Sequence, residues 1–305
     1  MVDFKDLVKA GVHFGHQTSR WNPRMAPYIW GHRHGIHLID VSKTAQSLEN
    51  AAKFLESVVA EGKPVLWVGT KKSAQEAVEN LAKELKMPYV SHRWIGGTLT
   101  NFPQVKKSVT KLLHFEDIIA RSAQFPYTKK ELLTFQKIVD RLESNVGGIR
   151  SLSWPIGAIV IVDVRKEKTT LSEANQAGIP VVALVDTNSD PSLIDYVIPG
   201  NDDSPKAVNF IINFLGEAVK RGIAEALRKQ QETKKAKADK AVEAAKKVAA
   251  PVQEDVIGVE VAEEDEFDSL EQKKAKKKIV KITKDEEGLT PTSSDKILKK
   301  EKKEF

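Results

Sequence analysis

The sequence predicts an α/β protein built on a doubly wound parallel sheet. Three stretches are continuous runs of apolar, mostly β-branched residues: PVLWVG at 64–69, AIVIVDV at 158–164 and PVVALVD at 180–186. Such runs are typical of strands that are buried on both faces of a sheet. Helical patterns separate them, and strands separated by helices pair in parallel through right-handed crossovers. The expected arrangement is Rossmann-like or flavodoxin-like.

Four segments carry the apolar spacing of helices that pack on such a sheet. They cover residues 43–61, 73–86, 168–177 and 205–221, and a shorter strand is expected at 196–198. Because these segments alternate with the long apolar runs, we expect helices on both faces of the sheet.

The segment from 103 to 146 interrupts this alternation, because it holds no strand signal. Both halves repeat apolar residues in steps of three and four, as helices do, although Glu116 stands where an apolar residue is expected. Thr128 and Glu131 have the spacing of a capping box, and QFPYT at 124–128 is typical of a turn. The segment is therefore predicted to be an antiparallel helical hairpin. Helices of about 20 residues would extend about 30 Å, which suits contact with a large partner.

The composition changes after the last predicted helix. Residues 229–305 are rich in Ala, Lys and Glu, with the acidic run EEDEF and the basic run KKAKKKIVKITK. Few side chains there can form a core, so we predict a disordered tail with transient helix, either solvated or in nonspecific contact with RNA. The chain thus divides into an α/β domain at 1–102 and 147–228, an inserted hairpin at 103–146 and a tail at 229–305.

Composition also excludes several kinds of site. The 305 residues contain no cysteine, which removes disulfides, thiolate zinc sites and cysteine nucleophiles. The first residues lack the apolar run of a signal peptide and no segment reaches membrane-spanning length, so we expect a cytoplasmic protein without a membrane partner. The formal net charge is only +6. A surface for nucleic acid therefore has to be a local patch.

Aspartates at the ends of the predicted strands raise the question of an enzyme. Asp163, Asp186, Asp202 and Asp203 could hold Mg²⁺ for phosphoryl transfer, and this is the alternative function. The same residue types also cap helices and make turns. No nucleophile with a partner base accompanies them, and GTKKS at 69–73 matches neither a dinucleotide-binding nor a P-loop pattern. The sequence therefore assigns no catalytic residue, cofactor, metal ligand or small-molecule substrate, and leaves open whether the aspartates hold an ion without catalysis.

Five of the seven histidines lie in HFGH at 13–16 and HRHGIH at 32–37. Their spacing could serve a zinc site. The segment also contains Pro23 and Pro27 and shows no helix or hairpin pattern that would aim the rings at one point. These histidines are therefore expected to be hydrogen-bonding residues of a core or an interface.

Arginine and aromatic residues alternate in the same segment, which we expect to be irregular. It contains, in order, Arg20, Trp21, Arg24, Tyr28, Trp30 and Arg33. Guanidinium groups make bidentate contacts with phosphate, and flat rings stack on bases. Irregular RNA is recognised in this way because the deep groove of its duplex is closed to side chains. The residues favour RNA binding, and a protein interface with aromatic hot spots is the other interpretation.

Six motifs resemble those of one known family. They are HFGHQTSRWNPRMAPYIWG, VGTKKSA, RWIGGTLTNF, GGI, IPVVALVDTNSDP and IPGNDDSP, in that order. Over about residues 3–221 the chain resembles the bacterial-type ribosomal protein two of the small subunit. That family is described as a doubly wound parallel sheet with an inserted helical hairpin, in agreement with the apolar pattern. The tail is longer than in the plain bacterial form, so the resemblance gives it no function.

The resemblance implies a non-catalytic, structural component of the small ribosomal subunit that supports translation. The implied partners are small-subunit rRNA, other small-subunit ribosomal proteins and ribosomal protein one, for which the family provides a docking site. A partner protein away from the ribosome is a third interpretation. From their chemistry, ten residues in or near these motifs are expected to contact rRNA: Arg20, Trp21, Arg24, Arg33, Lys71, Lys72, Arg93, Asn101, Lys106 and Lys107.

Overall fold

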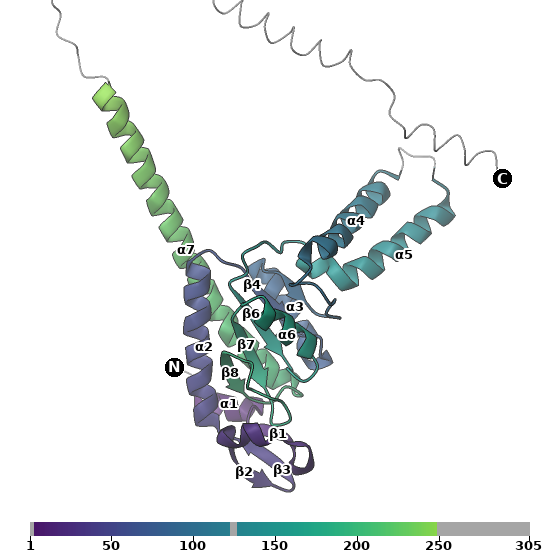
Figure 1. Cartoon of the computed structure of the whole chain (residues 1–305), viewed down its shortest axis with the longest axis vertical. Helices are drawn as coiled ribbons and strands as arrows, with labels where there is room; N and C mark the ends of the chain where they lie inside the picture. The colour runs from purple at the N-terminus through teal and green to yellow at the C-terminus, as the bar shows by residue number, and fades with distance from the viewer. Residues whose placement is uncertain (1–2, 123–126, 249–305) are drawn as a thin grey trace, which may run out of the picture. The chain divides into compact units, whose positions relative to one another are not determined.

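The computed structural model of the chain describes residues 3–122 and 127–248, with side chains as far as 229 (Figure 1). Residues 1–243 form one compact unit, which contains every candidate residue named above. A second unit, 244–305, contributes only the end of the last helix to the described residues. No helix within the described ranges is long and apolar enough to cross a membrane.

The central element is a parallel sheet of five strands in the order β5-β4-β6-β7-β8. The strands are β4 (Val65–Val68), β5 (Tyr89–Val90), β6 (Ala158–Val162), β7 (Val181–Val185) and β8 (Tyr196–Pro199). Counted along the chain from β4, this is the order 2-1-3-4-5 of flavodoxin-like folds. The predicted parallel α/β sheet is confirmed. Strand β5 was not predicted, because two residues are too few to show an apolar pattern.

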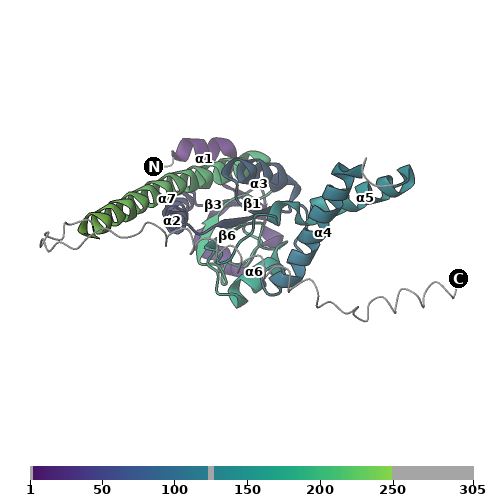
Figure 2. The same ribbon diagram turned by 90° about the horizontal axis from the view of Figure 1, so that it is seen from above.

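Alternate side chains of the strands enter two separate apolar cores. Trp67 and Val160 belong to one core, and their neighbours Leu66 and Ile159 belong to the other. The first core also contains residues of α1 (Phe4–Ala10), α2 (Val41–Ala60), α3 (Lys72–Leu85) and α7 (Pro205–Val248). The second contains residues of α4 (Phe102–Ala120), α5 (Lys129–Val146) and α6 (Lys168–Gln176). Helices thus cover both faces, and Figure 2 shows α1, α3 and α7 on one side of the strands and α6 on the other.

The last helix is longer than predicted, whereas α2, α3 and α6 begin and end within two residues of the predicted bounds. The last helix was predicted to end at residue 221 and a disordered tail to begin at 229, but α7 continues to Val248. The helix extends further because Ala, Lys and Glu are among the strongest helix formers, and they can continue a helix that does not pack against an apolar core. The rest of the predicted tail, 249–305, lies outside the described residues.

Two helices, α4 and α5, occupy the segment assigned to an inserted hairpin. They contact each other through Phe115 and Phe135, whose ring centroids are 5.5 Å apart. The expected capping box is present at the start of α5. Glu116 interrupts the apolar spacing because it accepts two hydrogen bonds from the Arg150 guanidinium, at 2.6 and 3.1 Å. Most of the turn expected at 124–128 lies outside the described residues.

The N-terminal segment is a second, antiparallel sheet, so the expectation of an irregular segment without a hairpin was wrong. Its strands are β1 (Phe14–Gln17), β2 (Ile29–Arg33) and β3 (Ile36–Ile39), in the order β1-β3-β2. His34 and Gly35 join β2 to β3 with positive φ angles of 52° and 74°, as a type I′ turn requires. These strands show no recognisable strand pattern in the sequence, because they are short. In addition, β2 carries exposed tryptophan, histidine and arginine in place of alternating β-branched residues.

The packing of α7 on α2 leaves no room for a side chain at Gly222. A Cβ atom there would lie 2.6 Å from the main-chain oxygen of Glu56. We expect Gly222→Ala to lower the free energy of unfolding by about 1–3 kcal/mol, because overpacking outweighs the ~1 kcal/mol that alanine otherwise adds to a helix. Urea unfolding followed by circular dichroism measures the change. Gly31→Ala is the control, since nothing lies within 4 Å of a Cβ there. A more stable Gly222→Ala protein would contradict this packing.

Candidate nucleic-acid interface

The N-terminal sheet lies against the carboxyl edge of the parallel sheet. The amide of His16 donates a hydrogen bond to Thr187 Oγ1 (2.9 Å), and the amide of Asn22 donates to the Thr187 carbonyl oxygen (2.7 Å). Gly15 permits this approach, because a Cβ on it would lie 2.6 Å from Thr187 Cγ2. The arginine and aromatic residues of this segment therefore lie beside the edge where α/β folds of this kind bind their ligands.

Arg20 lines a cavity of about 740 Å³ with two further cations, Arg165 and Lys168. Both follow β6, and both are exposed. Asp190 is the only carboxylate among the described lining residues. Three cations against one carboxylate make the cavity suited to an anion. Arg165 and Lys168 were not among the predicted site residues, although the run RKEK directly after a predicted strand was a signal that could have indicated them.

Arg24 is exposed, and its guanidinium is paired with the loop after β7. Its Nη1 atom lies 2.5 Å from Asp190 Oδ2 and 3.0 Å from Ser192 Oγ. Hydrogen bonds from Ser192 and the charge of Arg24 hold the pKa of Asp190 below its ordinary value. Asp190 Oδ1 also accepts a hydrogen bond from the Ser192 amide (3.1 Å), so this loop contains the aspartate turn that its composition indicates.

Trp21, Trp30 and Arg33 present exposed surface on or beside the N-terminal sheet. Trp21 is 39% exposed, and its ring centroid lies 5.3 Å from that of His37. Trp30 is 76% exposed in the middle of β2, and Arg33 at the end of that strand is exposed as well. Exposed rings of this kind can stack on a base or pack against a protein.

The remaining candidates belong to other elements than the N-terminal sheet, and all except Lys71 are exposed. They are Lys72 in α3, Arg93 and Asn101 before α4, and Lys106 and Lys107 in α4. Within the described ranges, no hydrogen bond, ion pair or ring contact joins them to the arginines near β1 and β2.

One buried carboxylate organises the motif at 92–101. Glu173 of α6 accepts hydrogen bonds from Trp94 Nε1 (3.0 Å) and from the amides of Gly97 (2.9 Å) and Leu99 (3.0 Å). Burial acts to raise the pKa of Glu173, but these hydrogen bonds outweigh it and the pKa lies below its ordinary value. Trp94 is buried and structural, and Arg93 next to it is exposed.

Lys71 is held by carboxylates of the protein. Its Nζ atom lies 2.7 Å from Asp202 Oδ1, 2.5 Å from Asp203 Oδ1 and 3.5 Å from Asp163 Oδ2. Burial acts to lower the pKa of Lys71, but the hydrogen bonds to Asp202 and Asp203 outweigh it and raise the pKa above its ordinary value. The ammonium that was expected to contact rRNA is thus paired inside the fold.

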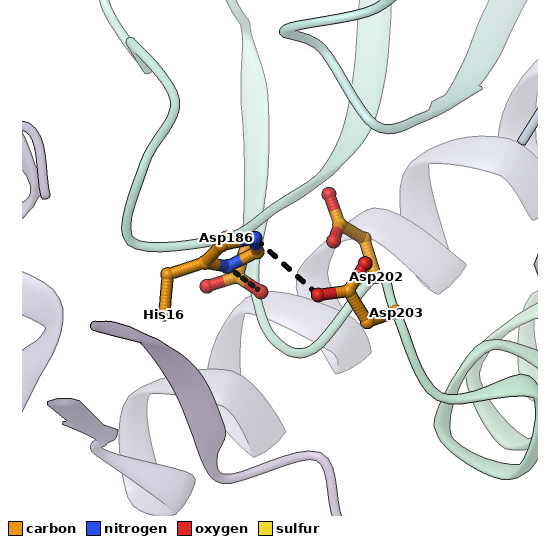
Figure 3. Close-up of side chains that lie close together, drawn as sticks. All are labelled: His16, Asp186, Asp202 and Asp203. Carbon is orange, nitrogen blue, oxygen red and sulfur yellow. Dashed lines mark ion pairs between the residues drawn. The ribbon is translucent and has the colours of Figure 1, made fainter. Parts of the chain in front are cut away.

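His16 completes this acidic cluster (Figure 3). Its Nδ1 atom lies 2.9 Å from Asp186 Oδ2, and its Nε2 atom lies 3.3 Å from Asp203 Oδ2. The hydrogen bond with Asp186 raises the pKa of His16. His16, Asp186, Asp202 and Asp203 each offer a ligand atom, and these atoms all lie within 4.8 Å of one another. The aspartates were correctly predicted to lie at strand ends. Their contact with His16 was not predicted, because the N-terminal sheet was not predicted.

The α/β part of the chain matches a known protein family. The family model described as ribosomal protein S2 matches residues 7–222. The chain belongs to the ribosomal protein S2 family. A small ribosomal subunit protein uS2 from Cytophaga hutchinsonii is 45% identical over 233 residues, which cover 76% of this chain and 92% of that protein. Membership of the S2 family agrees with the resemblance seen in the six motifs, and it gives no support to phosphoryl transfer by the strand-end aspartates.

The hydrogen bonds to Glu173 lead to a prediction about stability and pH. We expect Glu173→Gln to lower the free energy of unfolding by about 2–4 kcal/mol, because an amide nitrogen would face N–H donors that now meet a carboxylate. The pKa of Glu173 is lower in the folded protein than in the unfolded chain. The carboxylate therefore stabilises the fold fully above its unfolded-state pKa, and this stabilisation is lost as the pH falls through its folded-state pKa. The difference in free energy of unfolding between the wild type and Glu173→Gln should therefore become smaller below about pH 4.

Thermal unfolding monitored by circular dichroism between pH 7 and pH 3 tests this. Glu76→Gln, a change at an exposed residue of α3, is the matched control and should leave the melting temperature unchanged. If the difference in melting temperature between the wild type and Glu173→Gln stays constant over the whole pH range, the charge of the carboxylate does not stabilise the motif at 92–101.

Proposed function

We propose that this protein binds small-subunit rRNA along the sheet edge that carries the N-terminal sheet. As a member of the S2 family it is a structural ribosomal protein of the small subunit, which in bacteria lies in the cytoplasm. The proposal concerns how it is attached there. The parallel sheet is the rigid base, and the loops and the N-terminal sheet at its carboxyl edge make the contacts.

The observation that carries the proposal is the cavity lined by Arg20, Arg165 and Lys168. Guanidinium and ammonium groups bind phosphate oxygens through charge-assisted hydrogen bonds, and phosphate contacts supply a large share of the affinity in protein–nucleic acid complexes. The charge of Asp190 on the same wall is balanced by Arg24. The cavity therefore keeps a net positive charge at a place where the backbone of folded RNA can enter.

Exposed residues outside the cavity add to this surface. Trp21 and Arg33 extend it over the N-terminal sheet, and a second area of contact comprises Lys72, Arg93, Asn101, Lys106 and Lys107. We leave Lys71 out, because its ammonium is paired with Asp202 and Asp203. In this proposal residues 1–102 and 147–228 are the base, and the insertion at 103–146 reaches a neighbouring part of the subunit.

Loss of one cavity cation should weaken attachment in a salt-dependent way. Arg20→Ala and Lys168→Ala are each expected to lower the affinity for small subunits stripped of this protein, and to reduce the slope of log affinity against log salt by about 1. Cosedimentation at increasing potassium chloride concentrations measures both quantities. Lys53→Ala, which removes a charge from an exposed position on α2, is the matched control. Variants that keep the wild-type slope would exclude the cavity as a phosphate site.

The proposal also includes docking of ribosomal protein one, which is supported by the family resemblance. Small subunits reconstituted without the present protein should then lose ribosomal protein one in a sucrose gradient and regain it when the wild-type chain is added back. Retention of ribosomal protein one on the depleted subunits would refute the docking role and leave the rRNA contacts untouched.

A further inference from the structure

The cavity lined by Arg20, Arg165 and Lys168 is larger than a phosphate group requires. Its volume of about 740 Å³ lies within the range of about 300–1,000 Å³ that is usual for small-molecule sites. A phosphate group in contact with the three cations fills only a small part of this space. The other walls of the cavity therefore indicate what else the ligand carries.

Hydrogen bonds fix the walls of the cavity to one another. The lining residues lie in three ranges: 19–22, 164–172 and 188–193. The amide of Asn22 donates to the Thr187 carbonyl oxygen (2.7 Å), which holds the first range to the third. Asn175 Nδ2 in α6 donates to the Leu193 carbonyl oxygen (3.1 Å), which holds the third range to the second. The cavity is thus formed before a ligand enters, and this lowers the entropic cost of binding.

The three cations of the cavity are free to bind an anion. Among the described residues, no carboxylate forms an ion pair with Arg20, Arg165 or Lys168. Asp190, on the same wall, is paired with Arg24. Guanidinium and ammonium groups in this state suit the oxygens of a phosphate group.

Three further lining residues form an apolar wall: Val164, Leu171 and Leu193. Val164 and Leu171 are buried, whereas Leu193 is 60% exposed. The flat face of an unstacked base packs against apolar side chains when a protein binds a single nucleotide. A nucleotide, with a phosphate group at one end and a flat ring at the other, therefore matches both the cations and the apolar wall.

Two asparagines of the cavity offer hydrogen-bond donors to such a base. Asn22 Oδ1 accepts the amide of Arg24 (3.0 Å), and Asn188 Oδ1 accepts the hydroxyl of Ser189 (2.9 Å). Neither asparagine nitrogen has a hydrogen-bond partner among the described residues, so both remain donors. Guanine carries two neighbouring acceptors, O6 and N7, on one edge, whereas adenine carries an acceptor and a donor there. The free donors thus favour guanine.

We propose that this cavity binds one guanine nucleotide. Its phosphate lies on Arg20, Arg165 and Lys168, its base lies against the apolar wall, and the side-chain nitrogens of Asn22 and Asn188 donate to O6 and N7. The inference rests on the proposed phosphate contacts of the cavity and names the group that enters with the phosphate. An unpaired guanosine of rRNA and a free guanine nucleotide share this chemistry, so the test has one arm for each.

The first arm titrates the full-length protein with GMP, AMP and ribose 5-phosphate in a calorimeter. GMP should bind at one per chain and about tenfold more tightly than AMP, because adenine presents a donor to donors. Ribose 5-phosphate should bind more weakly than GMP, because it lacks a base. Asn188→Ala should reduce the preference for GMP over AMP to about threefold. Leu193→Ala should weaken GMP binding about fivefold by removing part of the apolar wall.

The second arm measures the fluorescence anisotropy of labelled RNA hairpins with one bulged guanosine, one bulged adenosine or no bulge. Binding that is about tenfold tighter for the bulged guanosine identifies an unpaired nucleotide of RNA as the ligand. If the three hairpins bind alike while GMP is preferred over AMP, the ligand is a free nucleotide.

Two control variants match these changes: Asn209→Ala and Leu227→Ala, at exposed residues of α7. Both should keep the wild-type preference. The inference is overturned if neither GMP nor the bulged guanosine is preferred over its adenine counterpart, or if Asn188→Ala and Leu193→Ala bind as the wild type does.

Failure of the guanine site can be told apart from failure of the proposed function. Equal binding of ribose 5-phosphate, GMP and AMP would remove the guanine site and leave the phosphate site in place. A wild-type salt slope in Arg20→Ala would exclude the phosphate site itself.

Discussion

Thr187 fixes how the two sheets of this protein meet. Its hydroxyl accepts the amide of His16, its carbonyl accepts the amide of Asn22, and its side chain fills the space that a side chain on Gly15 would need. A second contact, from the amide of Asn201 to the Val12 carbonyl (3.0 Å), fixes the same segment to the end of β8. The position of the N-terminal cations and the assembly of the acidic cluster both depend on this close approach, because neither group lies within one sheet.

The carboxyl edge of the parallel sheet carries an acidic cluster and a cavity lined mainly by cations. The carboxylates of Asp186 and Asp202 are buried, where His16 and Lys71 contact them. The cations Arg20, Arg165 and Lys168 line the wall of a cavity. The buried cluster holds the N-terminal sheet in place, and in the proposed function the cations of the cavity contact an anionic partner.

The parts that could be predicted from the sequence are those whose signal is local. The strands around Trp67, Ile161 and Ala183 are continuous apolar runs, so their burial could be predicted without knowledge of their neighbours. Pairing between distant residues could not be predicted. Glu173 meets Trp94, and Asp186 meets His16, only because of how the elements pack. The ion pairs of Lys71 could not be predicted for the same reason, since a lysine after a strand has the same sequence signal whether it faces RNA or aspartate.

The edges of the parallel sheet limit its contact with other chains. At one edge β5 pairs over two residues only. At the other, β8 ends in Pro199, which has no amide hydrogen to offer, and its carbonyl oxygen already accepts the buried hydroxyl of Thr44 (2.7 Å). A neighbouring chain therefore finds few free backbone groups for strand addition. Both edges of the parallel sheet thus protect the folded protein against pairing with strands of its own copies.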